Sequence, residues 1–98
     1  KVRNSAPTYY SADAKVTNSL IADGCEIFGE VENSILFRGT KIGKGTKVKN
    51  SILFQDTFTG ENVVLNCVIA DKNVVIRDNK VLSGDETLPF YLAKGKMI

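Results

Sequence analysis

The 98-residue chain is 43% hydrophobic and 24% charged, and its formal net charge is +2. A chain of this length forms one small domain with one modest core. Its charge is too low and its lysines too scattered to indicate nucleic acid, and its apolar runs are far shorter than a membrane span, so we expect neither partner.

Residues 1–13 predict a polar, extended lead-in segment. No apolar stretch follows Lys1, so no secretory signal is indicated and we expect a cytoplasmic protein. Because the chain does not begin with Met, we expect it to be a fragment of a longer protein from which a partner domain is missing.

Residues 14–84 contain a short motif that recurs four times. Each copy has an aliphatic residue, a variable residue, Asn, a small residue and two further apolar residues. The copies begin at Val16, Val31, Val48 and Val64, and their asparagines are Asn18, Asn33, Asn50 and Asn66. Internal repetition of this kind is the signature of a solenoid.

Apolar residues in this region recur at steps of five or six, which matches neither a helix nor a long alternating strand. The positions that show it are Val31, Leu36, Ile42, Val48, Leu53, Val64, Ile69, Val75 and Val81. Three such steps per copy predict a triangular coil, with a short strand on each side and one aliphatic residue per side pointing to the axis. We therefore predict an all-β chain, a single-stranded parallel β-helix of about four coils.

Turn residues lie between the apolar steps, as a triangular coil requires. They include Gly24, Gly29, Gly39, Gly43, Gly45 and Gly60, and glycine suits corners that need a positive φ or a close approach of the backbone. Pro7 and Pro89 lie outside the repeats, where they do not interrupt a ladder. Thr59 stands where an aliphatic residue is expected, so we predict one distorted coil near residues 54–62.

The repeated asparagines have two interpretations. They could be a row of ligand-binding amides, or a structural ladder in which each side chain bonds to the next coil. We favour the ladder. Ser19, Ser34, Ser51 and Cys67 follow the asparagines as small corner residues, and none has a base at a matching offset, so none is a candidate nucleophile.

Residues 85–98 are predicted to form a C-terminal capping segment. Tyr9 and Tyr10 precede the first coil, and an apolar run from Leu88 to Leu92 follows the last one. Open sheet edges invite association, so we expect these segments to cover the coil ends or to dock a neighbouring domain. The chain should then self-associate or expose an apolar patch.

The step Ile42-Gly43-Lys44-Gly45 resembles the hexapeptide-repeat family of left-handed β-helices. The run from Ala6 to Tyr10, together with residues 18–25 and 31–39, is similar to the carboxy-terminal domain of bacterial glucose-1-phosphate adenylyltransferase (ADP-glucose pyrophosphorylase). This resemblance extends from about Pro7 to Gly95. Residues 74–84 and the ending Lys94–Ile98 resemble the GlgD-type companion subunit of that family.

The resemblance implies an oligomerisation and allosteric regulatory domain in glycogen biosynthesis. Members of the family convert ATP and glucose 1-phosphate to ADP-glucose and diphosphate in an amino-terminal nucleotidyltransferase domain that binds ATP and Mg²⁺. No cofactor, metal or catalytic residue is therefore carried over to this chain. The expected partners are the chain's own catalytic domain, a homo- or hetero-oligomer with a catalytic subunit, and a phosphorylated metabolite as effector.

Two other functions remain open. Many hexapeptide-repeat proteins are acyltransferases with a histidine general base, but this chain contains no histidine. A purely structural solenoid, such as an ice-binding one, would need regular threonine rows, of which Thr57 and Thr59 form only one pair. The two cysteines, Cys25 and Cys67, are expected to be buried, reduced thiols.

Basic residues are expected on the outside of adjacent coils. Of these, Arg38, Lys41 and Lys44 are candidates for an effector anion site, because phosphorylated effectors act near the domain junction in the related enzymes. The alternative, which we favour, is a solvated surface that keeps sheet edges soluble.

Overall fold

The computed structural model describes residues 7–98 and contains fifteen short parallel strands and, within those residues, no helix. The strands form three five-stranded sheets. In sheet A they are β1 (Tyr9–Tyr10), β4 (Glu26–Ile27), β7 (Lys41–Ile42), β10 (Phe58–Thr59) and β13 (Val75–Ile76). In sheet B they are β2 (Lys15–Thr17), β5 (Glu30–Glu32), β8 (Lys47–Lys49), β11 (Val64–Asn66) and β14 (Val81–Ser83). In sheet C they are β3 (Leu20–Ile21), β6 (Ile35–Leu36), β9 (Ile52–Leu53), β12 (Val68–Ala70) and β15 (Phe90–Leu92).

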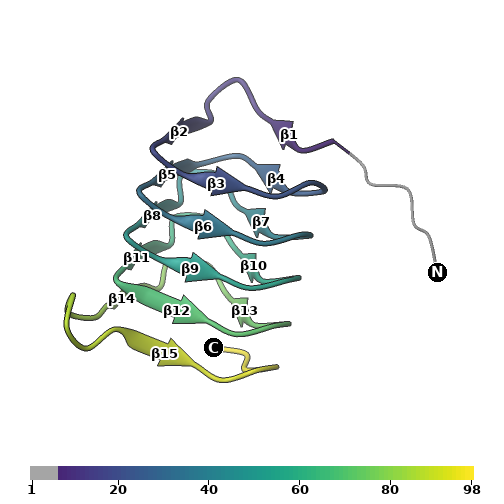
Figure 1. Cartoon of the computed structure of the whole chain (residues 1–98). Coiled ribbons are helices and arrows are strands. Elements are labelled where there is room, and N and C mark those ends of the chain that lie inside the picture. Colours follow the sequence, from purple (N-terminus) through teal and green to yellow (C-terminus); the bar gives the residue numbers. More distant parts are fainter. Residues whose placement is uncertain (1–6) are drawn as a thin grey trace.

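The chain visits the three sheets in turn and stacks each coil on the one before (Figure 1). It makes four complete turns from β1 to β13 and then adds β14 and β15. The predicted three-sided parallel β-helix of about four coils is thus confirmed. The sheets reach beyond residues 14–84, because β1 lies in the predicted lead-in segment and β15 in the predicted capping segment. Residues 1–6 of the lead-in lie outside the described residues.

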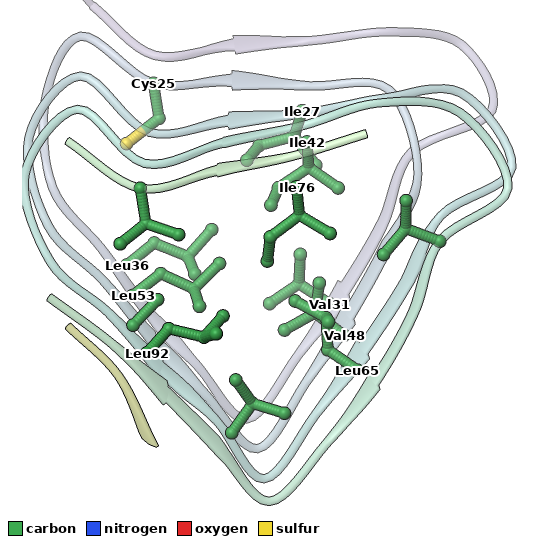
Figure 2. Close-up of a cluster of buried hydrophobic side chains, with 14 residues drawn as sticks. Cys25, Ile27, Val31, Leu36, Ile42, Val48, Leu53, Leu65, Ile76 and Leu92 are labelled. Carbon is green, nitrogen blue, oxygen red and sulfur yellow. The ribbon is translucent and has the colours of Figure 1, made fainter. Parts of the chain in front are cut away.

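Aliphatic side chains from all three sheets meet along the axis of the triangle (Figure 2). Each coil repeats the same inward positions, as in Ile27 over Ile42 and Leu36 over Leu53. These side chains are fully shielded from solvent. One shared column therefore replaces the separate cores that such short coils could not form alone.

The predicted inward positions are correct up to Leu53 and wrong by one residue from Val64 onward. Val48 pairs with Leu65 rather than with Val64. Val64 is 39% exposed and Leu65 is fully buried, and the inward residues that follow are Ala70, Ile76 and Leu82 rather than Ile69, Val75 and Val81. A shift of one residue moves every side chain of a strand to its other face, so here the outward residues were mistaken for the core.

The backbone at the corners explains this shift. Asn18, Asn33 and Asn50 have positive φ angles of 47°, 55° and 51° at the corner between sheets B and C, and in the next coil Cys67 takes this conformation, with φ 56°. Asparagine tolerates left-handed geometry and marks it in a sequence, whereas cysteine rarely adopts it. Aligning the fourth copy through Asn66 therefore placed its corner one residue too early.

Gly29 makes the second coil shorter than the others. Val16 and Val31 are paired at a spacing of 15 residues, whereas Val31 with Val48 and Val48 with Leu65 are 17 apart. A Cβ at Gly29 would lie 2.3 Å from the carbonyl oxygen of Thr46. The shortened corner therefore passes so close to the next coil that only glycine fits.

The distortion predicted near residues 54–62 is not present. Strand β10 pairs with both β7 and β13, and Thr59 occupies the inward position with 4% exposure. Its hydroxyl accepts a hydrogen bond of 3.1 Å from the Gly43 N–H, so the polar atom is satisfied inside the coil. Thr57 is also buried, and the pair does not form a surface row for ice.

Candidate functional site

The outer face of sheet C carries an unbroken row of apolar side chains. They lie in register on five adjacent strands and are Leu20, Ile35, Ile52, Ile69 and Tyr91. Leu20 is 69% and Tyr91 58% exposed, and the three isoleucines are half-buried. Because neighbouring strands lie about 4.8 Å apart, the row spans about 19 Å.

A second row runs beside the first, two residues farther along each strand. Its members include Ala22, Phe37, Phe54 and Asp71, which occupy equivalent positions in the backbone ladder. The rings of Phe37 and Phe54 stack at a centroid distance of 4.8 Å. We call the two rows together the sheet C face. No strand of sheet C contains a charged residue.

The outer face of sheet B is its opposite in chemistry. Lys15, Glu30 and Lys47 lie in register, so charges of alternating sign face one another across strands. Each cross-strand pair of opposite charge stabilises a solvated sheet by about 0.2–1 kcal/mol. The first three strands of sheet B therefore suit contact with water, although the same row ends in the exposed Val64 and Val81. Sheet C presents an apolar surface of the kind that marks an interaction site.

The outer face of sheet A has a shallow groove of about 820 Å³. Phe28 and Phe58 line it, together with Gly43 and Gly60, which have no side chains. The other uncharged lining residues are Thr59, Val75 and Ile76, and the charged ones are Lys41, Lys44, Arg77, Glu61 and Asp78.

The structure brings together two of the three predicted anion-site residues. Lys41 and Lys44 both line the groove, and Arg77 joins them. Arg38 is exposed at the corner between sheets C and A and does not line it. The Lys41 ammonium lies 3.7 Å from the Glu26 carboxylate, and both side chains are about half exposed, so this surface pair adds little stability.

The four asparagines lie in one row along the corner between sheets B and C. Asn18 Nδ2 donates to Asn33 Oδ1 at 2.6 Å, Asn33 Nδ2 to Asn50 Oδ1 at 2.7 Å, and Asn50 Nδ2 to Asn66 Oδ1 at 3.1 Å. Asn66 joins this asparagine row from the end of strand β11, although its backbone is out of step with the other three. The amides thus bond to one another, which is how a structural ladder uses them.

A serine row lies beside the asparagine row. Ser34 N–H donates to Ser19 Oγ, and Ser51 N–H to Ser34 Oγ, each at 3.0 Å. Val68 N–H donates to Ser51 Oγ at 3.1 Å. These hydroxyls are engaged with the backbone, which leaves them without the activation that a nucleophile needs.

The last coil is tied to the one before it by a side-chain bond. Tyr91 Oη donates to Asp71 Oδ2 at 2.9 Å. The pKa of the Asp71 carboxyl is lowered because it accepts hydrogen bonds from the Lys72 N–H and from Tyr91, and the pKa of Tyr91 is raised by the same bond. Leu92 is buried in the core, so the predicted capping segment contributes a strand to sheet C.

Both cysteines are free and buried. Burial raises the pKa of the Cys25 thiol, which donates to the Phe37 carbonyl oxygen at 3.3 Å. Among residues 7–98, no three His, Cys, Asp or Glu side chains gather to hold a metal, and no helix there is long and apolar enough to cross a bilayer.

Sequence reasoning placed the apolar docking surface at the coil ends and missed the sheet C face. A signal for this face is present in the repeats. The motif has two aliphatic residues in succession, Ile35-Leu36 and Ile52-Leu53, and adjacent residues of a strand point to opposite sides. One of each pair must therefore point outward.

Comparison with known proteins agrees with this architecture. Residues 6–88 match the family described as GlmU-like, C-terminal hexapeptide. The chain belongs to this family, and its fold is the left-handed parallel β-helix of hexapeptide-repeat proteins.

Two similar proteins extend this assignment. The chain is 48% identical over 95 residues to the glycogen biosynthesis protein GlgD of Bacillus subtilis (strain 168), covering 97% of this chain and 28% of that protein. It is 39% identical over 83 residues to the glucose-1-phosphate adenylyltransferase of Bacillus cytotoxicus, covering 85% of this chain and 22% of that enzyme. The chain thus spans about a quarter of the length of these relatives, and it is related to subunits of glycogen biosynthesis.

Proposed function

We propose that this chain is the assembly and regulatory domain of a GlgD-type subunit of a cytoplasmic glucose-1-phosphate adenylyltransferase. In the whole enzyme, ATP and glucose 1-phosphate would give ADP-glucose and diphosphate. ATP and Mg²⁺ would bind the nucleotidyltransferase domain, and the β-helix domain would contribute no catalytic residue. Its similarity to GlgD and to the adenylyltransferases supports this assignment.

The single observation that carries the assembly role is the sheet C face. A surface made mostly of aliphatic and aromatic side chains, with Asp71 as the charged residue among those named, is costly to leave in water. The sheet C face has Leu20 and Tyr91 at its two ends and the Phe37–Phe54 stack near its middle. We propose that this face packs against the adenylyltransferase domain of a partner subunit.

The test is a charge placed at the centre of this face in the whole subunit. Ile52→Glu should prevent assembly with the catalytic subunit, measured by size-exclusion chromatography with light scattering. Val64→Glu is the matched control, since Val64 is an exposed valine on the charged sheet B face. Normal assembly of the Ile52→Glu variant, with circular dichroism showing it folded, would contradict the proposal.

The groove on sheet A supports a second role, the binding of a phosphorylated effector. Lys41, Lys44 and Arg77 bring three cations to one hollow, and cations of this kind bind phosphate through charge-assisted hydrogen bonds. The double variant Lys41→Ala/Lys44→Ala should lose the response of ADP-glucose synthesis to the effector. Arg38→Ala is the control and should respond normally, because Arg38 lies outside the groove; the reverse result would move the effector site elsewhere.

A further inference from the structure

Two pairs of an exposed asparagine followed by a buried serine lie in adjacent coils, at Asn33-Ser34 and Asn50-Ser51, and a third Asn-Ser pair, Asn18-Ser19, precedes them in the first coil. Asparagine is thermolabile, because the backbone nitrogen of the next residue can attack the side-chain carbonyl carbon. The N–Cγ bond forms, the Cγ–Nδ2 bond breaks, and ammonia leaves with the proton of the backbone nitrogen. Water then opens the cyclic imide, so asparagine and water give aspartate or isoaspartate and ammonia.

The attacking nitrogen is held at both sites by a hydroxyl of the preceding coil. Ser34 N–H donates to Ser19 Oγ and Ser51 N–H donates to Ser34 Oγ, each at 3.0 Å. The two hydroxyls are oriented in turn, because Ser19 donates to the Thr17 carbonyl and Ser34 to the Glu32 carbonyl, each at 2.8 Å. To attack, each nitrogen must first lose this bond.

The carbon under attack is held as well. The Asn33 amide accepts from Asn18 and donates to Asn50, and the Asn50 amide accepts from Asn33 and donates to Asn66. The Asn33 and Asn50 N–H groups are bonded to the carbonyl oxygens of Thr17 and Glu32. Each amide would have to leave the asparagine row to reach the neighbouring nitrogen.

We propose that the serine row protects Asn33 and Asn50 from deamidation, a role separate from the proposed function of the domain. The asparagine row depends on every member being an amide. An aspartate at position 33 would be a carboxylate without a donor for Asn50 Oδ1, so it would break the row and add a charge at the corner. The serine hydroxyls therefore preserve the chemistry of the corner as well as its shape.

Two variants test the proposal because each frees a different nitrogen. Ser19→Ala frees the N–H of Ser34, so Asn33 should deamidate about fivefold faster, the factor that one ordinary hydrogen bond is worth. Ser34→Ala frees the N–H of Ser51, so Asn50 should accelerate by a similar factor while Asn33 stays slow. Peptide mapping by mass spectrometry after incubation of the whole 98-residue chain at mildly alkaline pH would follow both sites.

The crossed pattern makes each variant the control for the other. Ser34→Thr keeps the hydroxyl and should restore the slow rate at Asn50. Equal acceleration of both sites in each variant would show general loosening of the corner and would overturn the proposal. Unchanged rates at both sites would overturn it too, and so would a rapid reaction in the Ser34→Thr variant.

Discussion

Phe37 and Phe54 stack on the outside of the β-helix, with ring planes 6° from parallel. They lie on adjacent coils and belong to the sheet C face, so the stack joins two coils without using the core. The backbone ladder places the two residues at equivalent positions of their coils.

The first prediction concerns the energy of this stack. A double-mutant cycle of Phe37→Ala and Phe54→Ala should give a coupling free energy of about 0.5–1.5 kcal/mol in urea unfolding, because stacked rings interact beyond their buried area. Additive effects of the two substitutions would show that the rings are only neighbours.

The second prediction separates Leu65 from Val64. Leu65→Ala should lower the free energy of unfolding by about 2–5 kcal/mol, because it leaves a cavity in the core column. Val64→Ala, on the exposed side of the same strand, should change it by less than about 1 kcal/mol. Denaturant unfolding of both variants measures the difference, and a larger loss at Val64 would mean that the register of β11 is wrong.

The third prediction tests the shortened corner. Gly29→Ala should destabilise the chain strongly, because its Cβ would meet the backbone of Thr46 and Gly43, which cannot move aside without breaking the coil. Gly95→Ala is the control, because its Cβ has open space around it and only its φ of +75° is unfavourable. That control should cost roughly 1–2 kcal/mol. The melting temperatures of the two variants would rank them, and a smaller drop for Gly29→Ala would refute the close contact.

The fourth prediction concerns pH. The pKa of Asp71 is lowered in the folded chain, so its contribution to stability is complete above the unfolded pKa. This contribution is lost as the pH falls through the folded pKa. Tyr91→Phe removes one of the hydrogen bonds that lower the Asp71 pKa. The wild type should therefore have a higher free energy of unfolding than this variant at neutral pH, and the difference should disappear in acid.

Unfolding in urea at a series of pH values measures this gap. Tyr10→Phe serves as the control, because it removes a hydroxyl from an exposed tyrosine at the opposite end of the helix and leaves the Asp71 bond intact. A gap of constant size from neutral to acid pH would show that the Tyr91 hydroxyl does not act through Asp71.

The repeat and its step of five or six residues determined the fold of this protein from the sequence alone. Only a three-sided coil places an aliphatic residue on the axis at Val31, Leu36, Ile42 and Val48 while keeping lysine and glutamate outside. The asparagines marked the corner at residues 18, 33 and 50, because positive φ angles favour asparagine over most residues. Local chemistry and periodicity were sufficient for these features.

The tertiary structure alone decided the rest, because it depended on how coils lie over one another. It placed Cys67 at a left-handed corner and so chose Leu65 over Val64 for the core. It also aligned the outward residues of five strands into the sheet C face and brought Lys41 and Lys44 to the groove without Arg38. Residues about 17 positions apart become neighbours only when the coil closes. Their spacing in the sequence does not determine which face of the β-helix they share.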